Sequence, residues 1–82
     1  MEKSKLLKRI TMNPEVMVGK PVIKGTRLTV QYIVGLLAGG MTEDDILEEH
    51  KELAKEDIQA CLVFASEILK NSAYMPLAAE VP

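Results

Sequence analysis

GKPVIKGTRLTVQYIVGLLAGG, residues 19–40, is the stretch that decides how the rest of the chain folds. Its first half, Val22 to Leu28, contains two short β-prone pieces on either side of Lys24-Gly25. A Gly at the second position of a tight turn supplies the positive φ that the turn requires, so this half predicts a small hairpin. From Val30 onward the apolar residues recur with the period of an amphipathic helix, which Gly39-Gly40 ends. The stretch therefore predicts a β-arm that leads directly into a helix.

Three helices are predicted, at residues 30–38, 43–50 and 55–71, and their starts resemble one another. In each, an apolar residue precedes a cap position, and an Ile follows five residues after that apolar residue, which is the spacing of a hydrophobic staple. The three starts are Leu28-Thr29 with Ile33, Met41-Thr42 with Ile46, and Leu53-Ala54 with Ile58. A Thr side chain can cap each of the first two helices, whereas Ala54 cannot cap the third.

The remaining segments complete the predicted fold. Residues 1–7 are expected to be a frayed basic lead-in, and Lys8 to Met12 alternates polar and apolar residues as a short strand does. Strands this short cannot stand alone, so we expect them to lie on the helices or to pair with another subunit. The chain is thus predicted to be mainly α, with a short N-terminal β-arm or hairpin before three helices in one domain, residues 1–72. Residues 73–82 form an apolar tail that contains two prolines.

The third helix is apolar on two sides, which predicts self-association. One stripe consists of Ile58, Cys61, Leu62, Ala65, Ile68 and Leu69, and Ala60, Val63 and Phe64 lie on nearly the opposite side. A helix with two apolar sides is normally buried on both. An 82-residue chain has only one small core and its single Cys excludes an internal disulfide, so we expect the second side to form a homodimer interface. The alternative is that Phe64 packs beneath the β-arm or the tail.

Charge is distributed unevenly along the chain. Residues 1–41 carry seven Lys and Arg against two acids, a net +5, whereas residues 42–82 carry three Lys against ten acids, a net −7. The two halves can neutralise each other, or the basic β-arm can contact nucleic acid. The candidate nucleic-acid contacts are Arg9, Lys20, Lys24 and Arg27. Both helix pairs that could form a helix-turn-helix would present acidic residues to the phosphates, so the arm is the better candidate.

No catalytic, metal or cofactor site is predicted, and we do not expect an enzyme. His50 lies at a helix end that favours His electrostatically, and Cys61 falls on the main apolar stripe as a small hydrophobe. The acids of residues 43–49 read as a solvated helix face, since adjacent helical residues point in different directions. The N-terminus lacks the apolar core of a signal peptide, and no stretch approaches a membrane span. We therefore expect a cytoplasmic protein without a membrane partner.

The chain resembles a family of short prokaryotic proteins called domain of unknown function 433. The resemblance runs from Arg9 to Ala65, and its most specific motif is GKPVIKGTR at residues 19–27. The other matching motifs are RI at Arg9-Ile10, NPE at Asn13–Glu15, Met-Thr-x-x-Asp-Ile-Leu at Met41–Leu47, and Leu-x-x-Glu-Asp-Ile-x-Ala-x-Leu at Leu53–Leu62. The resemblance implies a three-helix, homeodomain-like bundle behind a β-arm. Some members of the family look like antitoxins that are paired with PIN-domain ribonuclease toxins. Lys51 and Ala54 depart from a Pro and a Ser/Thr that are common in the family.

These observations favour an antitoxin-like regulatory protein that binds a partner protein and, through its arm, DNA. The tail would cover the partner's active site, with Tyr74 and Leu77 as anchors; the alternative is that the tail is disordered. A second hypothesis is a dimeric protein-interaction module that does not bind nucleic acid.

Overall fold

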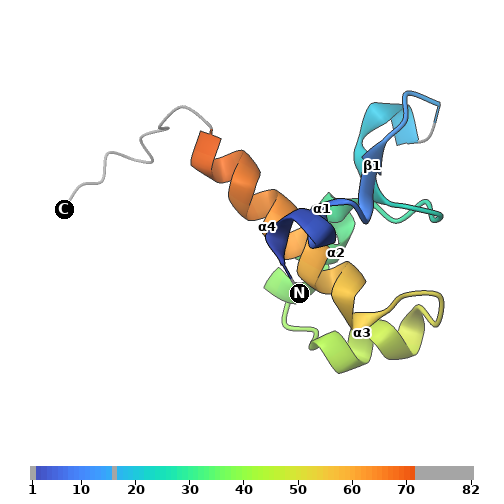
Figure 1. Cartoon of the computed structure of the whole chain (residues 1–82). Coiled ribbons are helices and arrows are strands. Elements are labelled where there is room, and N and C mark those ends of the chain that lie inside the picture. Colours follow the sequence, from blue (N-terminus) through green and yellow to red (C-terminus); the bar gives the residue numbers. More distant parts are fainter. Residues whose placement is uncertain (1, 16, 72–82) are drawn as a thin grey trace, which may run out of the picture.

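The computed structural model of the chain describes residues 2–15 and 17–71 and confirms a mainly helical fold with a short two-stranded hairpin near the N-terminus (Figure 1). The elements in chain order are α1 (Lys3–Leu7), β1 (Ile10–Met12), the 3₁₀ turn η1 (Met17–Gly19), β2 (Pro21–Ile23), α2 (Val30–Ala38), α3 (Glu43–Glu49) and α4 (Lys55–Asn71). No helix among the described residues is long and apolar enough to span a bilayer.

Helices α2, α3 and α4 are the three predicted helices, and the predicted Thr caps are present. The Thr29 hydroxyl accepts a hydrogen bond from the Tyr32 amide at 3.0 Å. The Thr42 hydroxyl accepts one from the Asp45 amide at 3.0 Å, and the Asp45 carboxylate accepts one from the Thr42 amide at 3.0 Å. This reciprocal capping box satisfies two amides that the helix itself leaves unpaired. The hydrogen bond from the Thr42 amide, followed by a smaller contribution from the Thr42 side chain, lowers the pKa of Asp45.

Helix α4 begins without a capping side chain at Ala54, as predicted. An acidic side chain within the helix instead accepts a hydrogen bond from the backbone amide of Ala54. The Asp57 carboxylate, one turn into the helix, accepts a hydrogen bond from the Ala54 amide at 2.8 Å. The same carboxylate accepts a second hydrogen bond from the Arg9 guanidinium at 3.0 Å. One acidic side chain therefore supplies the N3 half of a capping box at the start of α4 and also connects α4 to the segment just before β1.

The hairpin differs in its pairing from the predicted one. The turn at Lys24-Gly25 is present, with Gly25 at φ +83°, and the Ile23 amide donates to the Leu28 carbonyl across it. Beyond this turn, however, the pairing is reduced to a single bridge between Val22 and Thr29, because Thr29 already serves as the N-cap of α2. The sheet is instead formed by β1 and β2, antiparallel, with Thr11 opposite Val22. The expected strand within Lys8 to Met12 thus supplies the second strand.

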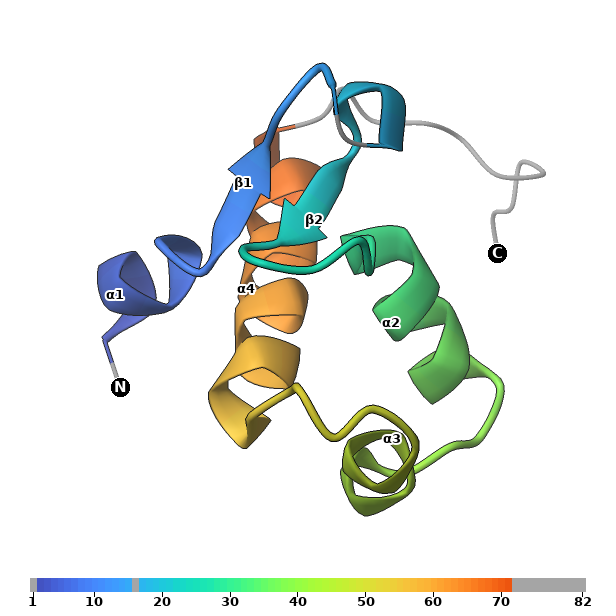
Figure 2. The same cartoon turned by 90° about the vertical axis from the view of Figure 1, so that its right-hand side faces the viewer.

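The prediction of a frayed lead-in at residues 1–7 is wrong, because this segment contains helix α1. Leu6 is only 5% exposed, and α1 packs along α4 (Figure 2). The Lys3 ammonium contacts the Glu67 carboxylate at 2.8 Å, and this hydrogen bond lowers the pKa of Glu67. Because the pKa is lowered on folding, this contact stabilises the packed helix above the ordinary carboxylate pKa and is lost as the pH falls through the lowered value. Both side chains are partly exposed, so the contribution is small.

The hydrophobic core lies where β2, α2, α3 and α4 meet (Figure 2). Its buried residues are Ile23, Val30, Ile33, Ile46, Leu53, Ile58 and Cys61. The three Ile residues that the staple spacing singled out, Ile33, Ile46 and Ile58, are each 0% exposed. The staple positions therefore supply the centre of the core as well as the helix starts.

We predict that Leu6→Ala lowers the free energy of unfolding by about 2 kcal/mol, because the change leaves a cavity between α1 and α4. Urea unfolding followed by circular dichroism at a fixed protein concentration measures this loss. Lys5→Ala, on the exposed side of α1, is the matched control and should change the stability by less than about 0.5 kcal/mol. Equal effects of the two changes would mean that α1 is not part of the folded unit.

Candidate interaction surfaces

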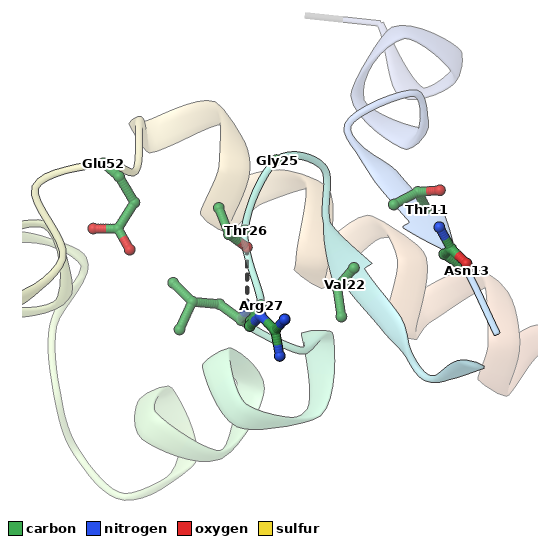
Figure 3. Close-up of a pocket in the computed structure, with 8 residues that line it drawn as sticks. Thr11, Asn13, Val22, Gly25, Thr26, Arg27 and Glu52 are labelled. Carbon is green, nitrogen blue, oxygen red and sulfur yellow. Dashed lines mark hydrogen bonds between the residues drawn. The ribbon is translucent and has the colours of Figure 1, made fainter. Parts of the chain in front are cut away.

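An open hollow lies beside the turn that joins β2 to α2 (Figure 3). It is lined by Thr11, Asn13, Val22, Gly25, Thr26, Arg27, Leu28 and Glu52. The Thr26 hydroxyl donates to the Ile23 carbonyl at 2.8 Å and accepts from the Leu28 amide at 2.9 Å, so it holds the turn in shape. Arg27 and Glu52 reach the hollow from different segments, and no ion pair between them is present in the described structure. Four residues of the GKPVIKGTR motif, Val22, Gly25, Thr26 and Arg27, thus form one wall of this open hollow.

The four predicted nucleic-acid contacts fall into two groups. Lys20, Lys24 and Arg27 are exposed, and among the described residues none of their side chains makes a hydrogen bond or ion pair. Arg9 differs, because its guanidinium is held by Asp57 at 3.0 Å, with side-chain exposures of 36% for Arg9 and 12% for Asp57. Arg9 is therefore a structural residue that ties the start of β1 to α4, and it is poorly placed to contact a phosphate.

The predicted dimer surface on α4 is largely covered within the chain. Ala60 is 0% exposed, which removes it as an interface residue. Val63 and Phe64 are half-buried, and Phe64 packs against the hydrophobic core. Glu67 is one helical turn beyond Val63, and its contact with Lys3 shows that α1 runs along this side of the helix. The second apolar side of α4 thus exists as predicted, but α1 covers much of it.

An apolar groove between α2 and the C-terminal half of α4 was not predicted. Its lining residues are Lys20, Pro21, Val30, Gln31, Val34, Gly35, Phe64, Ala65, Ile68 and Leu69. The predicted stripe of α4 is fully buried at Ile58 and Cys61, but Leu62 is 43%, Ile68 51% and Leu69 74% exposed. Helix length explains the exposure of Ile68 and Leu69: α4 has 17 residues and α2 has 9, so α4 is about 12 Å longer and its C-terminal end extends beyond the bundle (Figure 1). The unequal helix lengths were visible in the sequence and could have indicated this groove.

The two residues considered for catalysis, His50 and Cys61, both pack against other side chains. His50 meets the Tyr32 ring edge-on, with ring centroids 5.8 Å apart. Cys61 is fully buried, and desolvation, with a smaller contribution from the negative charge of Asp57, raises the pKa of its thiol to about 12. Such a thiol is almost entirely protonated at neutral pH and is a poor nucleophile. No group of acidic, His and Cys side chains with metal-binding geometry occurs in the part of the chain that the structure describes.

Tyr74 and Leu77, the predicted anchors of the tail, lie outside the described residues.

The fold and these surfaces define a class of small helical proteins in which a β-hairpin precedes a three-helix bundle. Residues 10–65, more than half of the chain, match the family described as "Protein of unknown function (DUF433)", and the chain belongs to this family. The chain is similar to a structure described as the crystal structure of a DUF433 member protein from Anabaena variabilis, with 24% identity and a TM-score of 0.73. The similarity covers 82% of this chain and 66% of that one, just under two thirds of its length. A comparison with curated proteins found no match.

We predict that Asp57→Ala lowers the free energy of unfolding by about 2–3 kcal/mol. The change leaves the Ala54 amide uncapped and deprives the half-buried Arg9 guanidinium of its carboxylate. Urea unfolding measures the loss, and Asp57→Asn, which keeps an oxygen for the Ala54 amide, should have a smaller effect. An Asp57→Ala protein as stable as the unmodified chain would contradict this assignment of Asp57.

Proposed function

We propose that this protein is an antitoxin-like regulator that binds a partner protein in the groove between α2 and α4. The observation that supports the proposal most directly is the exposed apolar end of α4, where Leu69 is 74% exposed beside Val34 and Phe64. Contiguous exposed apolar residues in a small protein commonly mark a protein-binding surface. Some members of the DUF433 family resemble antitoxins of PIN-domain ribonuclease toxins, so we take a PIN-type ribonuclease as the partner in this proposal.

The groove has the chemistry of a site for an amphipathic helix or an extended apolar segment. Val30, Val34 and Ala65 supply an apolar floor between two helices, and Lys20 and Gln31 provide polar groups at the lining. Helix-in-groove binding uses an apolar face of the partner and leaves its polar face in water. A ribonuclease would contribute such a segment, and its burial against Leu69 would remove apolar surface of both proteins from water.

We predict that Leu69→Glu abolishes co-purification with a PIN-type ribonuclease encoded in the adjacent gene and relieves its inhibition. A buried carboxylate in an apolar contact costs several kcal/mol, which corresponds to a loss of affinity of at least about a hundredfold. Leu62→Glu is the matched control, because Leu62 is an exposed Leu on the same helix but does not line the groove. Co-purification from tagged co-expression and a ribonuclease assay provide the measurements.

The alternative function is a dimeric protein-interaction module that does not bind nucleic acid. It would use the same groove, so a partner other than a ribonuclease would still be lost on Leu69→Glu. Co-expression distinguishes the two functions. If the neighbouring ribonuclease is neither bound nor inhibited by the unmodified chain, the antitoxin proposal fails and the interaction module is the better proposal.

A second candidate activity is DNA binding through the hairpin and its turns, which the exposed Lys20, Lys24 and Arg27 side chains support. Phosphate contacts of this kind are electrostatic and release counterions. The acidic first turn of α3, with Glu43, Asp44 and Asp45, argues against insertion of that helix into a groove.

We predict that Arg27→Ala weakens DNA binding and reduces its salt dependence by about one released counterion, because a phosphate contact is lost. Arg9→Ala should leave the salt dependence unchanged while lowering stability, since Arg9 is paired with Asp57. Fluorescence anisotropy with duplex DNA between about 50 and 200 mM salt measures both. Binding that is absent or insensitive to salt would remove DNA from the proposed function.

A further inference from the structure

The β1–β2 sheet leaves one edge of β1 unpaired. The Lys24 amide donates to the Arg9 carbonyl at 2.8 Å, and the register places Thr11 opposite Val22. Because hydrogen-bonded pairs alternate along an antiparallel ladder, Arg9 and Thr11 direct their backbone groups at β2. Ile10 and Met12 therefore direct theirs to the opposite side. In the described structure no hydrogen bond uses these groups of Ile10 or Met12, and Figure 2 shows no described element alongside that edge of β1.

From this geometry we infer that β1 pairs with β1 of a second copy of the chain, so that two hairpins form one four-stranded antiparallel sheet. An unpaired strand edge is a template for another strand, and a two-stranded sheet is marginal alone. The inference does not depend on the proposed partner protein, because β1 does not line the groove between α2 and α4.

The self-pairing has one favourable register, with Thr11 of one copy opposite Thr11 of its partner copy. In this register Ile10 of each copy faces Met12 of the other, so that every outward N–H and C=O of the two residues forms a bond with the second strand. A shift by one pair toward the C-terminus would place Ile10 opposite Pro14, which has no amide to donate. A shift in the other direction would require Lys8 to be extended, but Lys8 ends α1 in the helical region at φ −69° and ψ −12°.

The side chains fit the same register. Met12 is 61% exposed, whereas Ile10 packs against the hydrophobic core on the same face of β1. Residues directly opposite on adjacent strands have Cβ atoms about 5 Å apart, so Met12 of each copy would cover Ile10 of the other. The two-fold axis would pass perpendicular to the sheet at Thr11. The hollows that Thr11 and Arg27 line would therefore lie on the same face of the dimer and adjoin each other.

A proline at position 12 tests the inference directly. Met12→Pro removes an outward amide and leaves the β1–β2 ladder intact, because Met12 does not donate to β2 and Thr11 before it is already extended. We expect a dimer for the unmodified chain and a dissociation constant at least about tenfold higher for Met12→Pro, measured by sedimentation equilibrium. Met12→Leu keeps the amide and the apolar contact and should stay within about threefold of the unmodified chain. Circular dichroism and thermal melting verify that Met12→Pro folds.

A disulfide test gives a second measurement that does not require a destabilising change. Thr11→Cys places two thiols at a non-hydrogen-bonded pair with Cα atoms about 4.5 Å apart, within disulfide range, so mild oxidation should link two chains. Lys24→Cys, exposed in the turn that follows β2 and away from the outer edge of β1, should not link, and Cys61 is buried in the unmodified chain. A monomeric unmodified chain at about 500 µM, a Met12→Pro dimer of undiminished affinity, or equal linking of both Cys variants would each overturn the inference.

Discussion

The carboxylate of Asp57 is the constraint on which the arrangement of the chain depends. It caps α4 through the Ala54 amide and holds the Arg9 guanidinium, and it is only 12% exposed. This carboxylate stabilises the fold because its removal would leave two donors, the Ala54 amide and the Arg9 guanidinium, without this acceptor. Arg9 immediately precedes β1, so this one side chain sets where the sheet lies relative to the first turn of α4. The sheet in turn positions the turn at Gly25 and the start of α2.

The sequence predicted the three main helices because their signals are local and repeated. Thr29 and Thr42 cap within their own segments, and the staple spacing brings Ile33, Ile46 and Ile58 to the core. It did not predict α1, because five helical residues contain too few turns for a period to be recognised. The helix is stabilised by contact with α4, and such a contact between residues 64 positions apart leaves no local pattern. The predicted hairpin was partly wrong for a similar reason, since Thr29 serves two roles and the cap of α2 ended the strand.

The two apolar sides of α4 show how one sequence pattern can have two physical outcomes. The side of α4 that contains Ala60 is covered by α1, the segment that was predicted to be frayed. Burial of these apolar residues therefore does not require a second subunit. The stripe that was assigned to the core is buried at Ile58 but exposed at Leu69, because α4 is longer than the helix it packs against. Periodicity identifies the direction in which a side chain points. It does not identify how far along the axis a neighbouring element extends, and the groove arises from that difference.

The charge asymmetry of the sequence persists as a separation in space. The ion pairs of the described structure are Lys3–Glu67 and Arg9–Asp57, so the acids of α3 and the exposed cations of the hairpin do not neutralise each other directly. Figure 2 places the hairpin and α3 at opposite ends of the bundle. A dimer joined through β1 would bring the two basic hairpins together at its centre and leave the acidic helices at its periphery. Screening at physiological salt acts over about 8 Å, which reduces repulsion between the exposed cations of the two copies. The centre of such a dimer would then be its most positive surface, whereas the apolar grooves would remain open for another protein.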